Sequence, residues 1–121
     1  MDEVAFEHWV DRYGAAWQAK DADEFSDLFS NTARYYWTPL EQPKRGAEEI
    51  AGAFRAAVVT QENIQFEYSL LAWQDDTGLA HWVCRFNRAG SAVEIDGMLR
   101  GIFNENGLCE EFREWWHSTE Q

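Results

Sequence analysis

The order of hydrophobic periodicities along the 121-residue chain predicts an α+β domain. Apolar residues recur mainly at three- and four-residue spacing in the first half of the chain. In the second half they alternate at every second residue, as they do along β-strands. The length suits one hydrophobic core, because two cores of about 60 residues each would both be marginal. We therefore expect a single domain over residues 1–121.

Three segments have the spacing of amphipathic helices. Their apolar stripes are Phe6, Trp9, Val10, Tyr13, Ala16 and Trp17; then Phe25, Leu28 and Phe29; then Ala47, Ile50, Ala51, Phe54 and Val58. Asp21 stands three residues before Glu24, which is the spacing of a capping box at the start of the second helix. Glu48 and Glu49 suit the positive N-terminus of the third helix.

Five segments alternate as strands do, at about residues 33–38, 64–70, 80–86, 93–103 and 108–117. Turn sequences separate the last four at residues 75–78, near Gly90 and at residues 104–107, so these strands should form an antiparallel meander. A strongly twisted meander with helices on one face can curl into a half-open cone.

The charge balance excludes several classes of partner. Lys and Arg number 10 against 22 Asp and Glu, giving a net charge of −12. Without a basic patch we expect no nucleic-acid partner and no anionic membrane surface. The first six residues lack the pattern of a secretory signal and no window approaches a membrane span, so we expect a cytoplasmic protein. Cys84 and Cys109 are expected to be reduced.

Several short segments together point to a known family. They are RYGAAW at 12–17, DADEF at 21–25 leading into LFS at 28–30, Gly46 followed by Ile50, DG at 96–97, Phe103 with Gly107, and FREWW at 112–116. Over nearly the whole chain the pattern resembles the nuclear-transport-factor-2-like superfamily, in particular its SnoaL-like polyketide-cyclase branch and the steroid delta-isomerases. The resemblance implies a cone with three N-terminal helices packed on a curved antiparallel sheet. It leaves the reaction open, because one fold serves many functions.

The resemblance also suggests site residues. Tyr13 resembles the isomerases' oxyanion-hole tyrosine, which donates its hydroxyl to a developing enolate. The isomerases' aspartate base corresponds to the neighbourhood of Trp37, where no carboxylate stands, and their second donor corresponds to Leu99. The chain is therefore not expected to be a steroid isomerase of the usual kind.

A second set of positions is similar to the epoxide hydrolases of the superfamily. Residues 112–115 resemble their Trp-Arg-Asp-Tyr stretch, with Glu114 in the place of the catalytic aspartate. Residues 85–87 resemble their Arg-x-Asp unit, but Asn87 cannot ionise, so a triad of that type is incomplete.

Glu114 and Asp96 are the two candidate bases. On an ideal strand Glu114 shares a face with Phe112 and Trp116, where desolvation would raise its pKa toward the range of a general acid or base. The alternative is a solvated Glu114 paired with an arginine. Asp96 has outward parity, in a ladder of opposite charges with Glu94, Arg85, Arg100 and Arg113, unless a bulge at Gly97 turns it inward. Tyr13 can equally be a structural tyrosine bonded to a carbonyl.

The inward rings predict a receptacle for a small apolar or aromatic molecule, although the same rings could simply fill a core. We expect the lining to comprise Trp17, Trp37, Phe54, Tyr68, Trp82, Phe86, Leu99, Phe103, Phe112 and Trp116. We expect no metal, because no histidine pairs at ligand spacing, and no cofactor. Chemistry, if present, would be acid–base: isomerisation, cyclisation, dehydration or epoxide opening. The alternative is a catalytically silent binding module. In either case we expect two copies of the chain to form a homodimer through the outer face of the sheet.

Overall fold

The computed structural model describes residues 1–121 and contains three helices and one six-stranded sheet. The helices are α1 (Glu3–Ala19), α2 (Ala22–Ser26) and α3 (Gly46–Val58). The strands are β1 (Phe29–Tyr36), β2 (Lys44–Arg45), β3 (Glu62–Gln74), β4 (Thr77–Arg88), β5 (Ser91–Phe103) and β6 (Cys109–Glu120). Their order in the sheet is β2-β1-β6-β5-β4-β3. The predicted α+β class and the four-stranded meander are confirmed.

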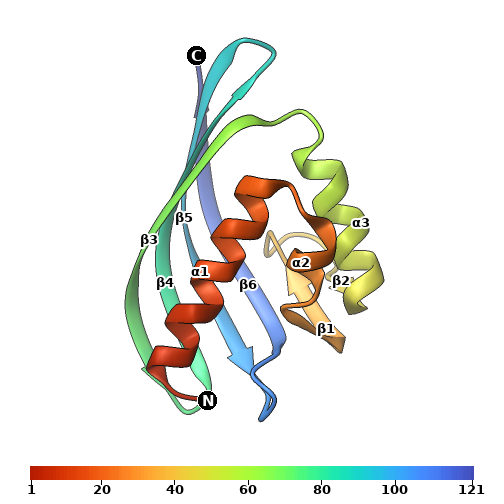
Figure 1. Cartoon of the computed structure of the whole chain (residues 1–121), viewed down its shortest axis with the longest axis vertical. Helices are drawn as coiled ribbons and strands as arrows, with labels where there is room; N and C mark the ends of the chain where they lie inside the picture. Colours follow the sequence, from red (N-terminus) through yellow and green to blue (C-terminus); the bar gives the residue numbers. More distant parts are fainter.

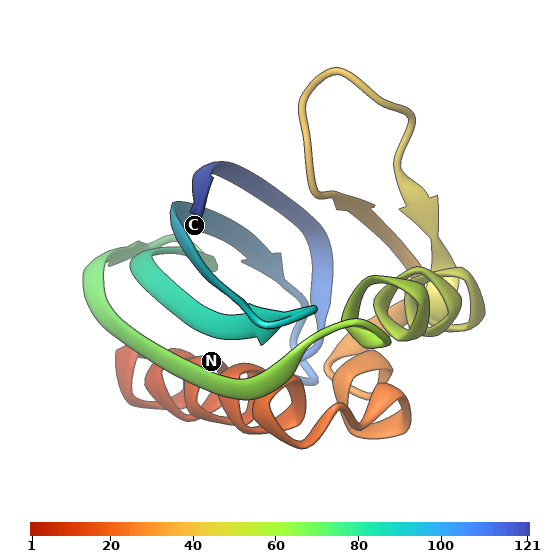
Figure 2. The same cartoon turned by 90° about the horizontal axis from the view of Figure 1, so that it is seen from above.

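The helices lie on the concave face of a curved, unclosed sheet. Helix α1 runs across the long strands, and α2 and α3 lie beside it near β1 (Figure 1). Seen from above, α1 lies along one side of the curled long strands, and the loop that follows β1 stands away from the body (Figure 2). Asp2 and Asp21 cap α1 and α2 by accepting backbone N–H groups, so the predicted capping residue Asp21 is confirmed. No helix is both long and apolar enough to cross a membrane.

Strand β1 differs from its predicted range. It begins four residues earlier than expected and ends at Tyr36, because Phe29 pairs with Cys109 while Tyr36 pairs with Arg113 in a parallel ladder with β6. A sequence pattern of alternation does not reveal this pairing, since it connects the first strand with the last. The short strand β2 pairs with β1 and was not predicted. Trp37 consequently lies in the loop after β1.

Aromatic rings fill the space between α1 and the sheet. Trp9 contacts Phe29, Phe103 and Phe112 with ring centroids 5.1–5.8 Å apart. Its indole nitrogen also donates a hydrogen bond to the carbonyl of Leu28 at 3.0 Å. Rings in edge-to-face and tilted contact add to the stability that burial alone provides. The predicted stripe of α1 is therefore the centre of the core.

Helix α1 packs tightly against β3 at Gly14, where a side-chain Cβ would overlap the ring of Phe66. That ring is held between Tyr13 and Trp17 and cannot easily move away. We expect Gly14→Ala to lower the free energy of unfolding by roughly 1–3 kcal/mol through overpacking, measured by urea denaturation.

The matched control is Gly52→Ala, since a Cβ at Gly52 in α3 would meet no atom within 4 Å. There the ordinary helix preference for alanine should raise stability by about 0.5–1 kcal/mol. Equal stabilisation at both positions would contradict the close packing of α1 against β3.

Candidate functional site

A cavity of about 410 Å³ lies between the helices and the concave face of the sheet. Thirteen of its 18 lining residues are hydrophobic, so the cavity is suited to an apolar molecule. Helix α1 contributes Tyr13 and Trp17, and α3 contributes Phe54. The sheet contributes Trp82 and Glu114, among others. The core rings therefore leave a space that side chains do not fill.

Five of the ten residues expected at the cavity line it: Trp17, Trp37, Phe54, Trp82 and Trp116. The other five, Tyr68, Phe86, Leu99, Phe103 and Phe112, are not among the lining residues, which corrects the prediction. Phe103 and Phe112 pack under Trp9, and Tyr68 reaches Asp11 on α1 at 2.5 Å. Inward parity decides the face of the sheet, but it does not tell which part of that face α1 covers.

The polar centre of the cavity is the carboxyl group of Glu114. Its Oε1 accepts hydrogen bonds from the hydroxyl of Tyr13 at 2.5 Å and from the hydroxyl of Tyr35 at 3.0 Å. Tyr13 comes from the buried stripe of α1. The parallel pairing of β1 with β6 sets Tyr35 opposite Phe112, two residues from Glu114. Sequence reasoning identified Glu114 and Tyr13 but not Tyr35, whose inward parity on β1 was the available signal.

Glu114 is buried, with 5% of its surface exposed, and forms no ion pair. Burial raises its pKa to about 7, against a smaller lowering by the hydrogen bonds from Tyr13 and Tyr35. Burial, followed by the nearby Glu114 charge, raises the pKa of both tyrosines well above the ordinary value, so both remain neutral donors. A carboxyl group in this setting can gain or lose a proton near neutral pH.

The two oxygens of Glu114 have different environments. Both tyrosine hydroxyls donate to Oε1, whereas Oε2 accepts no hydrogen bond from the protein. Oε2 is also not one of the polar atoms sealed within the protein without a partner. Because Glu114 lines the cavity, Oε2 is the oxygen that a bound molecule can reach. The tyrosines thus hold the carboxyl group through one oxygen and leave the other without a protein partner.

Asp96 lies on the outer face of the sheet. Its carboxylate is 2.7 Å from Nε2 of His81, and its side chain is 61% exposed. The ladder between β4 and β5 runs through Gly97 without a register shift, so no bulge turns Asp96 toward the cavity. Asp96 therefore cannot contact a molecule bound there. Its side chain points outward, as the alternation of the strand predicts. The expected charge ladder on this face is present, for example between Arg85 and Glu94 at 2.7 Å.

A second polar group of the cavity was not predicted. Gln61, between α3 and β3, lines the cavity and is 4% exposed. Its Oε1 accepts a hydrogen bond from Nε1 of Trp17 at 2.8 Å, and its backbone carbonyl accepts one from Nζ of Lys20 at 2.8 Å. A single glutamine after a helix carries no signal in the sequence, because its burial depends on how α3 returns to the sheet.

Side chains of the kinds that bind metals are dispersed. No group of three or more His, Cys, Asp or Glu residues is arranged to hold a metal ion. Cys84 and Cys109 are free and buried. Burial is the main cause that raises the pKa of each thiol, to about 12 for Cys84, so neither is a ready nucleophile.

The raised pKa of Glu114 has a consequence for stability. The folded-state pKa of about 7 lies above the ordinary value of 4.5, so the folded protein holds this proton more tightly than the unfolded chain. The contribution to folding is full below pH 4.5 and is lost as the pH rises through 7, an effect of about 3 kcal/mol. We expect Glu114→Gln, measured by urea denaturation at pH 5 and pH 8, to gain about 2.5 kcal/mol relative to the parent between the two pH values, because the unfolded carboxyl group is already mostly ionised at pH 5.

Glu110→Gln is the control for this experiment. Hydrogen bonds from Ser30, first, and Asn104 lower the pKa of Glu110, so this group is ionised at both pH values. Its substitution should shift stability equally at pH 5 and pH 8. If Glu114→Gln also changed the stability by the same amount at pH 5 and pH 8, Glu114 would not titrate in this range.

Comparison with known proteins shows which family and which solved structures this chain resembles. A family model described as SnoaL-like domain matches residues 10–112. RV0760c from Mycobacterium tuberculosis has 14% identity and a TM-score of 0.84, covering 100% of this chain and 99% of its own. The epoxide hydrolase/cyclase-like enzyme SalBIII, which has a role in pyran ring formation in the polyether salinomycin, has 17% identity and a TM-score of 0.82. The match covers 96% of this chain and 93% of SalBIII.

A third similar structure is the Delta 5-3-ketosteroid isomerase from Mycobacterium sp., with 13% identity, a TM-score of 0.79 and coverage of 97% and 98%. At these identities the likenesses show the fold. No curated protein sequence matches the chain. The family model covers most of the chain. The chain therefore belongs to the SnoaL-like domain family.

Proposed function

We propose that this protein binds a small, largely apolar molecule in its cavity and catalyses a proton transfer on that molecule without a cofactor. The observation that carries the proposal is the carboxyl group of Glu114: buried without a cation, held through Oε1 by two tyrosines, and open to the cavity at Oε2. A buried carboxyl group with a pKa of about 7 can act as a base or an acid at neutral pH.

We assign different roles to the three polar groups. Oε2 of Glu114 takes a proton from the bound molecule or returns one to it. Tyr13 and Tyr35 donate to Oε1 and stabilise the carboxylate, so they act as positioning residues. Tyr13 was expected to face a developing oxyanion, but its hydroxyl is directed at Glu114, 2.5 Å away.

Two similar structures support this class of chemistry. One is an epoxide hydrolase/cyclase-like enzyme and the other a ketosteroid isomerase, as their names state. Both names denote conversions of small molecules. The alternative remains a catalytically silent module that binds the same kind of ligand. A surface Glu114 paired with an arginine would favour that alternative. Glu114 is instead buried, and its hydrogen-bond partners are tyrosines.

Hydrogen–deuterium exchange at carbon tests the proposal without knowledge of the natural substrate. The probe is 2-acetylnaphthalene in D₂O, whose methyl protons next to the carbonyl exchange when a base removes them, as followed by proton NMR. We expect the protein to accelerate exchange, with a rate that rises as the pH increases through about 7 because the carboxylate is the active form. Glu114→Gln should reduce the accelerated rate by roughly a hundredfold or more.

Asp96→Asn is the matched control, because this carboxylate lies on the opposite face of the sheet. It should leave the exchange rate unchanged. Binding of the ketone without accelerated exchange would favour the silent module. Full activity of Glu114→Gln would exclude Glu114 as the base.

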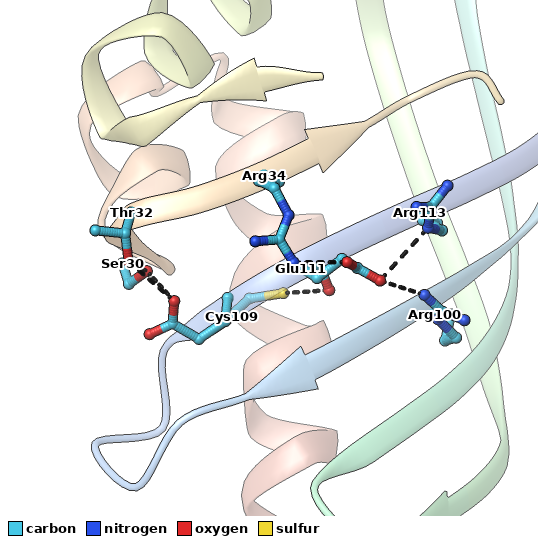
Figure 3. Close-up of polar contacts among 8 residues, drawn as sticks. Ser30, Thr32, Arg34, Arg100, Cys109, Glu111 and Arg113 are labelled. Carbon is cyan, nitrogen blue, oxygen red and sulfur yellow. Dashed lines mark hydrogen bonds and ion pairs between the residues drawn. The ribbon is translucent and has the colours of Figure 1, made fainter. Parts of the chain in front are cut away.

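We also propose that the outer sheet face joins two copies of the chain. Three arginines, Arg34, Arg100 and Arg113, converge there on the single carboxylate of Glu111 at 2.7, 2.5 and 3.4 Å (Figure 3). This end of the face therefore carries more guanidinium groups than carboxylates paired with them, in a protein of net charge −12.

The other end of the same face is acidic, and an apolar patch lies between the two ends. Glu67 and Glu94 share the single Arg85 at the acidic end. Met98 and Trp115, paired across β5 and β6, are 41% and 45% exposed. A second copy turned by a two-fold axis would bring the basic end of each against the acidic end of the other, around the apolar patch.

Sedimentation velocity of Trp115→Glu tests this interface. We expect the parent chain to sediment as a dimer and the variant as a monomer, because a carboxylate would be buried in the apolar patch. Leu40→Glu is the control, since Leu40 is almost fully exposed in the loop after β1 and should not affect association. A monomeric parent chain at tens of micromolar protein would contradict the proposal.

A further inference from the structure

Arg88 is the only cationic side chain among the residues that line the cavity. It is the last residue of β4, where it has the same inward parity as Trp82 and Phe86. Its side chain is 40% exposed, whereas Glu114, which lines the same cavity, has only 5% of its surface exposed. The cavity therefore extends from a buried carboxyl group to a partly exposed guanidinium group at its rim.

Two neighbouring side chains hold the guanidinium group of Arg88. Its central carbon lies 5.3 Å from the centre of the Phe86 ring, in a cation–π contact. Phe86 is buried in the core, so this ring is a fixed support. The Nε of Arg88 also donates a hydrogen bond at 3.3 Å to Oγ1 of Thr60, which lies between α3 and β3. The charged end of Arg88 is thus positioned by the protein before any ligand binds.

Much of the hydrogen-bonding capacity of Arg88 is unused. Its Nη2 donates to no protein atom, and its Nη1 donates only to Glu120, at 3.5 Å. This ion pair is long and its carboxylate is 48% exposed, so it contributes little free energy. Glu41, the other charged side chain that lines the cavity beside Glu114, forms no ion pair with Arg88. The edge of the guanidinium group formed by Nη1 and Nη2 is therefore available to a bound molecule.

The free edge of a guanidinium group matches a carboxylate, which can accept two parallel N–H bonds from it. We propose that the ligand is an apolar carboxylic acid, whose carboxylate binds Arg88 at the rim while its apolar body occupies the cavity toward Glu114. The anchored end then decides which part of the body lies beside Oε2 of Glu114. This inference rests on the proposed binding in the cavity and adds the charged end of the ligand.

A matched pair of probes separates the charge from the apolar contacts. 2-Naphthylacetate and 2-naphthylacetamide have nearly the same shape, but only the first is an anion. Equilibrium dialysis at pH 6 gives the Kd of each probe. At this pH the acid probe is ionised, since carboxyl groups ordinarily have a pKa of about 4, while Glu114, with its pKa of about 7, is mostly protonated and does not repel the probe.

We expect the parent protein to prefer the acid over the amide by about five- to tenfold, the range of one partly exposed charged contact. Arg88→Met keeps the apolar stem but removes the charge, so it should bring this ratio close to one. A Kd for the amide that stays close to the parent value shows that the cavity of this variant is intact. Arg55→Met is the matched control, because Arg55 carries the same charge but is exposed on α3 and does not line the cavity. It should keep the preference.

Glu120→Gln provides a second test, which serves if Arg88→Met does not fold. It removes the carboxylate that competes for Nη1 of Arg88, so it should raise the preference for the acid by about twofold or more. An unchanged ratio in this variant, a preference that survives in Arg88→Met, or equal binding of the two probes by the parent would overturn the role of Arg88 and leave the apolar cavity as proposed. A parent protein that binds neither probe would overturn the proposed function together with this inference.

Discussion

The burial of one carboxyl group without a cation is the constraint on which the site depends. Moving an ionised carboxylate out of water is highly unfavourable unless hydrogen bonds replace its hydration. Glu114 obtains two such bonds, both at Oε1 and both from tyrosines. They compensate only in part, so the pKa remains raised, at about 7. The same incomplete compensation weakens the folded state at high pH and lets the group gain or lose a proton near neutral pH.

The aromatic residues serve both stability and the cavity. Rings nearest the middle of α1, such as Trp9, are buried against the sheet. Further along the same helix, Trp17 has a hydrogen-bonding role as well, because its indole orients Gln61. Phe54 stacks on Phe25 at 4.1 Å and forms another part of the cavity wall. A rigid wall of rings lowers the entropy loss when a ligand is positioned.

Much of the fold could be predicted because side-chain periodicity reports directly on which face is buried. The stripe of α1, the inward position of Glu114 and the outward position favoured for Asp96 all follow from periods of 3.6 and 2 residues. The cavity lining could be predicted only in part, as Phe103 and Trp82 have the same parity but different neighbours. Whether a helix or a cavity covers an inward ring depends on long-range packing.

Local spacing in the sequence was enough to predict the class of fold, the buried face of each strand and the inward position of Glu114, whereas Tyr13 was suggested by its resemblance to the isomerases' tyrosine. Long-range packing was needed to bring Tyr35 to Glu114 and Gln61 to the cavity. Tyr35 reaches Glu114 because the first strand pairs with the last, and Gln61 enters the cavity where α3 returns to the sheet. Both contacts join residues far apart in the chain, and such contacts form only when the whole core packs, which no local pattern encodes.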